Sequence, residues 1–192
     1  MTVTRNRLLN VMLFISTSFC ILLLLTQLFV TVIFVHWHID RDFYSQFSFT
    51  ILDWNAFFKI THTETSVIGK AIGHVPTILS NISRLSFYFL FLQLSAITLL
   101  TLAAVREFIT VIRSVKQIRT FVSSNIESFR KIGFRLLLVF IFSGFHVMTF
   151  GNTALFGIYL HVTPLIMAVL SYTLSEIFKE GNALLEDNKG TI

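Results

Sequence analysis

Histidine is the residue type through which this chain could carry out chemistry. The chain has six histidines. His36 and His38 are separated by one residue, and His146 and His161 stand on either side of a Gly-Asn-Thr segment at 151–153. Imidazole is a common ligand of zinc, copper and iron, and it titrates near neutral pH. These four histidines are candidate ligands of a metal or haem site, or the groups of a pH-responsive site. The third interpretation is that they only form structural hydrogen bonds.

Other catalytic patterns are missing from the sequence. It has no Gly-rich phosphate loop, no H-E-x-x-H motif and no C-x-x-C motif, and its one cysteine, Cys20, lies in an apolar segment. No acidic residue occurs between 136 and 175, where an ion-coupled carrier would need one. We therefore predict that the protein is not an enzyme, and we predict no cofactor.

The composition is that of a membrane protein. Hydrophobic residues make up 54% of the 192 residues and charged residues only 13%, whereas soluble domains have about 25% charged residues. This excludes a disordered chain, and the single cysteine excludes a disulfide scaffold.

Segments without Asp, Glu, Lys or Arg locate the membrane spans, because a span needs roughly 20 apolar residues. Three such segments occur, at 8–39, 85–105 and 136–175. The third is long enough for two spans, and 151–153 is its natural turn. We predict an all-α membrane protein with one domain, 1–192, folded as a four-helix bundle. Its spans are placed at approximately 8–35, 85–105, 134–150 and 154–178.

The distribution of basic residues predicts the orientation, because Lys and Arg in short loops mark the cytoplasmic side. The N-terminal tail has Arg5 and Arg7 and no acid, and the outer loop at 36–84 has no excess of either charge. The inner loop at 106–133 and the start of span three are strongly basic through Arg106, Arg113, Lys116, Arg119, Arg130, Lys131 and Arg135. Both termini, including the tail at 179–192, are therefore predicted to be cytoplasmic, and all six histidines fall in the outer half.

The two loops carry patterns of their own. Partial alternation at 42–54 predicts a strand or a short β-hairpin, and 65–79 has the pattern of a short amphipathic element. In the inner loop, the apolar spacing of 106–121 predicts an amphipathic continuation of span two that lies along the inner membrane surface. The sequence Ser124-Asn-Ile-Glu127 fits a capping box, so a new helix should start there.

Two stretches carry a family pattern. The stretch at 121–133 (FVSSNIESFRKIG) has a Phe–Asn–Leu-Arg-x-Ile-Gly signature with Phe in place of Leu, and 176–192 (EIFKEGNALLEDNKGTI) is close to E-I-F-x-x-G-x-x-L-x-x-E-x-D-L-T-I. With four spans and a long first outer loop, the chain resembles a bacterial family of small membrane proteins of unknown function, domain of unknown function 2975. The matching residues are Phe121, Asn125, Arg130, Ile132, Gly133, Glu176, Ile177, Phe178, Gly181, Leu184, Thr191 and Ile192.

The resemblance implies a bacterial cytoplasmic (inner) membrane and a regulatory role, and it supplies no activity. We predict a non-enzymatic membrane protein that acts through protein or lipid contacts in a regulatory or sensory role. The alternatives are a metal- or haem-linked protein that uses the outer histidines, and a small transporter or channel subunit. Predicted partners are membrane lipids and a second copy or another membrane protein. Nucleic acid is not predicted, because the basic residues lie close to the bilayer.

The acidic residues that follow span four predict one contact. A short helix from Glu176 is expected to fold back beneath the basic inner loop, because its carboxylates complement the Lys and Arg residues there.

Overall fold

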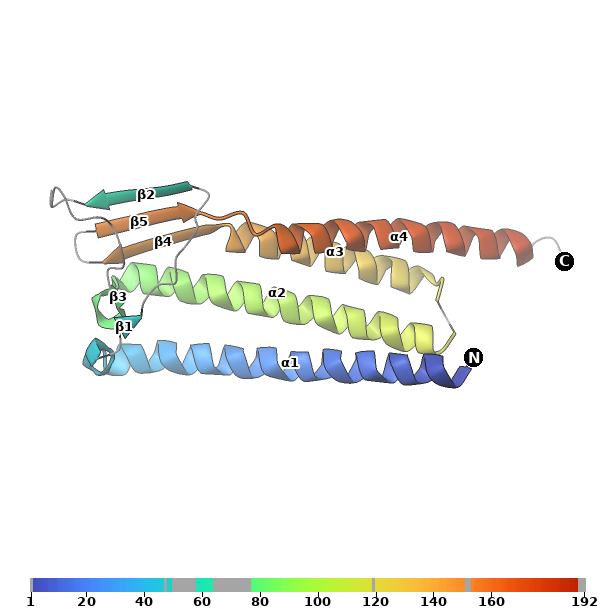
Figure 1. Ribbon diagram of the computed structural model, residues 1–192, viewed down its shortest axis with the longest axis horizontal. Coiled ribbons are helices and arrows are strands. Elements are labelled where there is room, and N and C mark those ends of the chain that lie inside the picture. The colour runs from blue at the N-terminus through green and yellow to red at the C-terminus, as the bar shows by residue number, and fades with distance from the viewer. Residues whose placement is uncertain are drawn as a thin grey trace. The chain divides into compact units, whose positions relative to one another are not determined.

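The computed structural model describes residues 2–46, 48–49, 58–63, 77–118, 120–150 and 153–189, and these are mostly helical (Figure 1). The four helices are α1 (Thr2–Ile39), α2 (Arg84–Lys116), α3 (Ser123–Ser143) and α4 (Val162–Lys189). Short 3-10 helices occupy Asp42–Gln46 and Leu79–Asn81.

Three of these helices are long and apolar enough to cross a membrane. They are Asn6–Ile39, Arg84–Lys116 and Val162–Asp187. A crossing requires about 20 residues at 1.5 Å per residue, and all three exceed that length. This confirms the predicted multi-pass membrane protein. Helix α3 is not among them, because its first half carries charges as far as Arg135.

The strands form two small antiparallel sheets. β1 (Ser48–Phe49) pairs with β3 (Thr77–Ile78). β2 (Phe58–Thr63), β5 (Thr153–Ile158) and β4 (Phe145–Phe150) form a three-stranded sheet in the order β2-β5-β4. One row across this sheet aligns Lys59, Gly157 and His146. The sheet therefore joins the loop after α1 to the loop after α3.

The β4–β5 hairpin corrects the predicted spans at 134–150 and 154–178. Helix α3 ends at Ser143 and α4 begins only at Val162, so the residues around the turn are strands rather than helix ends. The strand sequences FHVMTF and TALFGI are rich in aromatic and β-branched residues and flank a Gly-Asn turn former, which is a hairpin pattern. Absence of charge identified an apolar segment but did not distinguish helix from strand. Gly151 and Asn152 lie outside the described residues.

The strand predicted at 42–54 is also corrected in part, because the chain forms a 3-10 turn at Asp42–Gln46 before the short strand β1. The Asp40 carboxylate accepts a hydrogen bond from the Phe43 backbone N–H at 3.0 Å, which favours the turn. Residues 50–57 of this prediction, and 64–76 of the predicted amphipathic element, lie outside the described residues.

The inner loop is shorter than predicted. Helix α2 continues without a break to Lys116, so the segment predicted to lie along the membrane surface extends the span instead. The new helix predicted near Ser124 is confirmed, since α3 begins at Ser123. The backbone turns at Ile118, which has a φ of 64°, a conformation that is strained for a β-branched residue.

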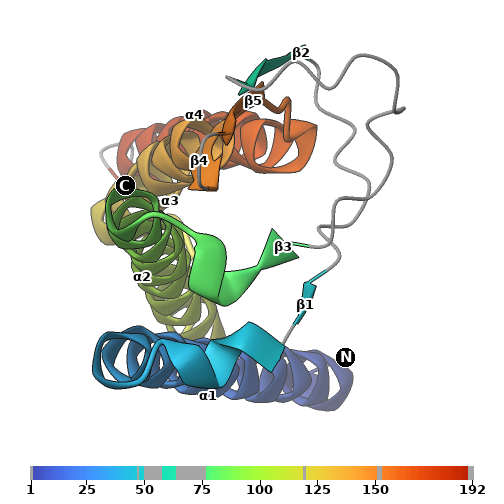
Figure 2. The same cartoon turned by 90° about the vertical axis from the view of Figure 1, so that its left-hand side faces the viewer.

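The chain divides into two compact units, and each is described by itself. Unit 1 comprises Met1–Thr26, Ile97–Phe140 and Val162–Ile192, and unit 2 comprises Gln27–Ala96 and Ile141–His161. Figure 2 looks onto unit 2, where β1 and β3 lie close to the short 3-10 segments. Unit 2 has a core of Trp37, Tyr44, Ile82 and Phe87. The core of unit 1 consists of Ala104, Val111, Phe129 and Ile132, with Phe178 packed against it. The described unit 1 core draws on α2, α3 and α4, and α1 contributes Trp37 to the core of unit 2. The predicted four-helix bundle stays a prediction.

Candidate functional site

His36 and His38, at the end of α1 in unit 2, are both engaged by tyrosine hydroxyl groups. Nδ1 of His38 lies 2.9 Å from the Phe34 carbonyl oxygen, and Nε2 lies 2.7 Å from the Tyr88 hydroxyl. A carbonyl can only accept, so Nδ1 carries the proton and Nε2 accepts from Tyr88. Nδ1 of His36 lies 3.1 Å from the hydroxyl of Tyr44, a group whose pKa is raised by burial and by nearby Asp40. These contacts fit the interpretation of structural hydrogen bonds.

Trp37, between the two histidines, is the anchor of unit 2, and sequence reasoning missed it. It is 2% exposed and stacks on Phe87 with ring centroids 4.2 Å apart. Its indole N–H donates to the Leu79 carbonyl at 3.2 Å. The Arg41 guanidinium lies 4.8 Å from the indole centroid and donates to the carbonyls of Ser80 and Ile82 at 2.6 and 2.7 Å. The sequence signal for this anchor is an Arg four residues after a Trp at a helix end, because at that spacing the guanidinium can stack on the indole ring.

His146 and His161 flank one aromatic ring. Tyr159 lies 4.9 Å from the ring of His146 and 6.2 Å from that of His161, measured between centroids. The Tyr159 ring lies over Gly157, where a Cβ atom would stand 2.8 Å from the hydroxyl oxygen. Burial, followed by the charge of His161, lowers the pKa of His146, and burial raises the pKa of Tyr159. His146 and His161, which the sequence places on either side of a turn, therefore both contact the ring of Tyr159.

The four histidines form two pairs, each with its own aromatic partners. Within the described part of the chain, no group of three or more His, Cys, Asp or Glu side chains could hold a metal ion. The side chain of His62 and all of His74 lie outside that part. The metal or haem hypothesis thus gains no support from these pairs and stays a prediction.

A second polar cluster in unit 2 fixes the hairpin to α2. The Ser83 hydroxyl contacts the Thr149 hydroxyl, and the Ser86 hydroxyl accepts from the Thr149 N–H at 3.0 Å. Gln93, 4% exposed, donates at 2.5 Å to the carbonyls of Phe142 and Phe145. The Phe142 carbonyl lies in the last turn of α3, where carbonyl groups have no partner within the helix, and the Phe145 carbonyl lies at the start of β4. The sequence gave no indication that these residues connect α2 to the hairpin, because single Ser and Gln residues within an apolar segment form no recognisable pattern.

In unit 1, the aromatic and glycine residues of the family pattern come together. The Phe121 ring covers Gly181, where a Cβ atom would stand 2.5 Å from the ring. Phe178 lies 5.4 Å from the Phe121 ring, measured between centroids. Gly133 similarly faces Tyr172, with a Cβ atom placed 2.9 Å from that ring. At Gly133 and at Gly181, the missing side chain therefore leaves room for an aromatic ring from another part of the chain. We call this arrangement a glycine seat.

Buried polar residues complete this junction of α3 and α4. Asn125 is 1% exposed, and its side-chain amide donates to the Thr120 carbonyl at 2.7 Å, across the turn before α3. Ser175 is equally buried, and its hydroxyl donates to the Ile126 carbonyl at 3.1 Å. Asn125 was among the predicted residues, whereas Ser175 was missed because a lone serine in a span gives no signal.

The predicted packing of the tail on the inner loop is observed. Arg130 and Glu176 form an ion pair with the nitrogen and oxygen 3.0 Å apart, and Lys179 also contacts Glu176, at 3.4 Å. The predicted fold-back is wrong, because α4 continues as one helix to Lys189 and meets α3 along its side. Ile132 belongs to the unit 1 core, and Leu184 is exposed. Thr191 and Ile192 lie outside the described residues.

We call this α3–α4 junction the signature junction, defined by Phe121, Asn125, Arg130, Gly133, Tyr172, Ser175, Glu176, Phe178 and Gly181. Its polar groups contact one another or the backbone of neighbouring turns. Such an arrangement sets the packing of two helices and presents no nucleophile with an activating base.

The apolar helices and their packing define the class, a multi-pass integral membrane protein. A family model described as "Protein of unknown function (DUF2975)" matches residues 65–192. The chain belongs to this family, which agrees with the resemblance found in its sequence. The matched region includes α2, α3, the β4–β5 hairpin and α4, and it begins after α1. The comparisons with curated proteins and with solved structures gave no match.

Proposed function

We propose that the protein is a four-span, non-enzymatic membrane protein of a bacterial inner membrane that acts through helix contacts with protein or lipid in a regulatory or sensory role. The observation that carries the proposal is the signature junction. The family-pattern residues of α3 and α4 converge on each other, so the pattern describes a helix arrangement. A small shift of packed helices against each other is one of the ways in which proteins transmit a regulatory change, and the signature junction is where such a shift would occur in this chain.

The three-stranded sheet supports α3 as the fourth span. β2 belongs to the loop between α1 and α2, and it pairs with β5 from the loop between α3 and α4. This pairing favours an arrangement in which both loops lie on one side of the membrane. In that arrangement α2 leads away from this side and α3 leads back to it as the fourth span.

The ion pairs support the same proposal. Arg135 of α3 lies 3.2 Å from Glu107 of α2, and these side chains are only 25% and 23% exposed. Arg135 also donates to the Ala103 carbonyl at 2.8 Å, and Glu107 accepts from the Ser128 hydroxyl at 3.1 Å. A charge that is paired and hydrogen-bonded is tolerated near the hydrocarbon where a free one is not.

Reporter fusions test the topology. Alkaline phosphatase, which is active only outside the cytoplasm, is inserted at 151–152 and, separately, after Ile192. We expect activity from the hairpin insertion and none from the C-terminal fusion. The opposite result, or equal activity from both, would contradict the four-span orientation.

Leu184 offers a test of the contact-based role, because it matches the family pattern but is 65% exposed on α4. Cross-linking and purification of the full-length chain from native membranes should capture a defined partner. We expect Leu184→Gln to lose that partner, whereas Leu185→Gln, a change at the neighbouring exposed leucine, should keep it. If wild type and both variants capture the same set, the role proposed for this surface is wrong.

A further inference from the structure

The charges of unit 1 are distributed unequally over its helices. The ion pairs that the structure describes join Arg130, Lys131, Arg135 and Lys179 to carboxylates, and all four of these cations belong to α3 or α4. The basic residues of α1 and α2 in this unit differ in their partners. Arg7, Arg106, Arg113 and Lys116 are exposed, and none of the ion pairs described involves them.

Arg106 and Arg113 share one face of α2. They are seven residues apart, which is about two helical turns or roughly 10 Å. Thr110 is exposed on the same stripe between them. Glu107, the acid of this helix segment, is directed to Arg135 and Ser128 of α3 and so does not neutralise the stripe.

The stripe continues onto α1. Lys116 follows Arg113 by three residues, and its ammonium donates to the side-chain oxygen of Asn10 at 2.8 Å. Asn10 shares a face of α1 with Asn6 and Thr17, by their helical spacing of four and seven residues. One side of the α1–α2 pair is therefore polar and cationic at this end of the helices.

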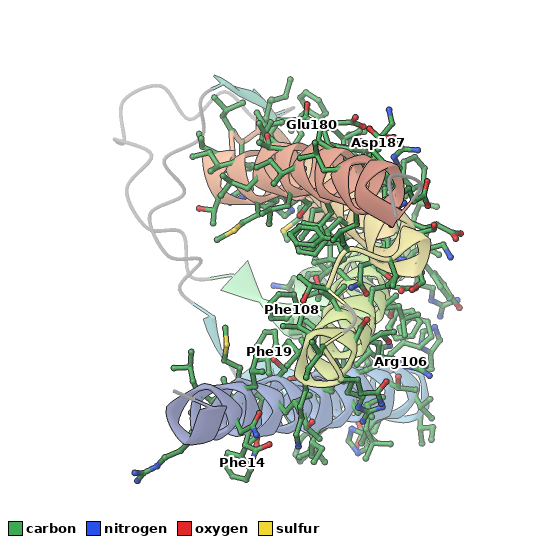
Figure 3. All side chains as sticks on the ribbon, turned by 90° about the vertical axis from the view of Figure 1, so that its right-hand side faces the viewer. Phe14, Phe19, Arg106, Phe108, Glu180 and Asp187 are labelled. Carbon is green, nitrogen blue, oxygen red and sulfur yellow. The ribbon has the colours of Figure 1, made fainter. Side chains whose placement is uncertain are left out.

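The other side of the same helix pair is apolar. Figure 3 shows Arg106 on one side of α1 and α2, and Phe19 of α1 with Phe108 of α2 on the other. Phe14, which is 74% exposed, points away from α2.

Apolar side chains also follow the cations on the same side of the helix pair. Ile21 and Leu24 are exposed and, by helical spacing, share the face of α1 on which Asn10 contacts Lys116. Cations followed along one face by exposed apolar side chains match a phospholipid, which has a charged phosphate and acyl chains.

We propose that Arg106 and Arg113, with Lys116 beside them, bind the phosphate of an anionic glycerophospholipid, whose acyl chains lie along the exposed apolar surface of α1. We call this surface the basic stripe, defined by Arg106, Thr110, Arg113 and Lys116 of α2. The choice of lipid follows from charge complementarity, because the stripe has three exposed cations and none of the described ion pairs involves them. This lipid site deepens the proposed function. It rests on the proposed function only for the choice of leaflet, which is the cytoplasmic one.

The experiment uses the full-length protein purified in a non-ionic detergent. Phosphatidylglycerol and phosphatidylcholine with identical acyl chains are added in turn, and retained lipid is counted by native mass spectrometry. We expect wild type to retain phosphatidylglycerol in preference. Each cation near an anionic headgroup contributes about a fivefold preference, so Arg106→Gln with Arg113→Gln should weaken retention by roughly 30-fold.

The matched control removes the same formal charge elsewhere. Arg130→Gln with Lys131→Gln replaces two cations of α3 that are already paired with Glu176 and Glu127. We expect this variant to retain phosphatidylglycerol like wild type. Equal loss in both double variants would show a general charge effect and overturn the site, as would the absence of any preference for phosphatidylglycerol in wild type.

A charge-conserving variant covers the case in which the glutamine variant fails to fold. Arg106→Lys with Arg113→Lys keeps both charges but not the planar fork that grips a phosphate. Retention between that of wild type and background supports the site, whereas retention equal to wild type contradicts guanidinium recognition. Because the reporter fusions are independent of lipid, a wrong orientation and a wrong lipid site give different results.

Discussion

Units 1 and 2 stabilise helix packing by different chemistry. None of the ion pairs described lies in unit 2, which relies on Trp37 stacked on Phe87 and on Arg41 and Gln93 bonded to backbone carbonyls. Unit 1 relies on glycine seats for aromatic rings and on ion pairs such as that of Glu107 and Arg135. The difference shows that the apolar composition says little about how the helices are joined, because the few polar side chains in each unit determine it. The variants below test this contrast, ordered by expected effect.

Trp37→Ala should have the largest effect and should act through unit 2. The side chain is 2% exposed and contacts Phe87, Arg41 and the Leu79 carbonyl. Truncating a buried tryptophan typically costs about 3–5 kcal/mol of unfolding free energy. Unfolding in detergent, followed by circular dichroism, measures the loss. Phe14→Ala, at a residue that is 74% exposed, is the control and should unfold like wild type; equal behaviour of the two variants would remove Trp37 as the anchor.

Asn125→Leu should be the next in size and should act through unit 1. The change removes the donor to the Thr120 carbonyl in a site that is 1% exposed. Leaving a buried polar group without its partner costs about 1–3 kcal/mol. Asn6→Leu, an exposed position on α1, is the matched control. Unchanged unfolding of the Asn125 variant would show that the signature junction does not depend on this amide.

Gly181→Leu tests the glycine seat. The new side chain occupies the position of the Phe121 ring, so the ring has to leave its contact with Phe178. Overpacking of this kind costs roughly 1–3 kcal/mol. The double variant Gly181→Leu with Phe121→Ala frees the space and should recover part of the loss in the same unfolding assay. If the second change adds its own penalty instead, the two residues do not share one site.

His146 gives unit 2 a pH dependence. Burial and the charge of His161 lower its pKa, so the folded state releases a proton more readily than the unfolded state. Stability is complete above the ordinary histidine pKa of about 6.5 and falls as the pH decreases below it, by at most about 1.4 kcal/mol per pH unit for one proton. The groups near His146 are Tyr159, His161 and, by strand register, Lys59. In the His146→Gln variant, the melting temperature should change less between pH 7 and pH 5 than it does in wild type. If it changes as much as in wild type, the pH dependence of stability comes from another group.

Reversal of both Arg130 and Lys131 to Glu should have the smallest effect of the series, because the ion pairs are exposed. The side chains of Arg130 and Glu176 are 51% and 57% exposed, and solvent screens such pairs. A lower melting temperature is still expected, with a smaller decrease at high salt. Arg135→Gln should lower it more, because the Arg135–Glu107 pair is less exposed. The reverse order would contradict the contrast between exposed and half-buried pairs.

Part of the candidate site followed from the sequence and part did not. Phe121, Asn125, Gly133 and Gly181 were found through a family pattern, and the ion pair of Arg130 with Glu176 followed from opposite charges on adjoining segments. The fold-back of the tail was predicted because its carboxylates complement the basic residues of the inner loop. Instead, Gly181 leaves room for a ring, and α4 continues past it.

The outer part was predicted less well, for a physical reason. The hairpin at 145–158 lies in an apolar segment, and hydrophobicity alone is the same in a buried helix and a buried strand. The strand β2 decides between them, since it supplies the hydrogen-bonding partner of β5 from a distant part of the chain. Ser86 and Gln93 belong to no sequence pattern, because their partners include backbone groups of that hairpin, the Thr149 N–H and the Phe145 carbonyl.

By itself, the sequence determined that the chain is apolar enough to cross a membrane several times, which stretches contain its three long apolar helices, and to which family it belongs. These properties depend on local composition, because a helix in lipid forms all its backbone hydrogen bonds within its own segment. Only the tertiary structure decided that two loops share one sheet, that His36, His38, His146 and His161 each contact a tyrosine, and which of the described cations are paired. Those properties depend on groups far apart in the chain, whose distance is set by packing.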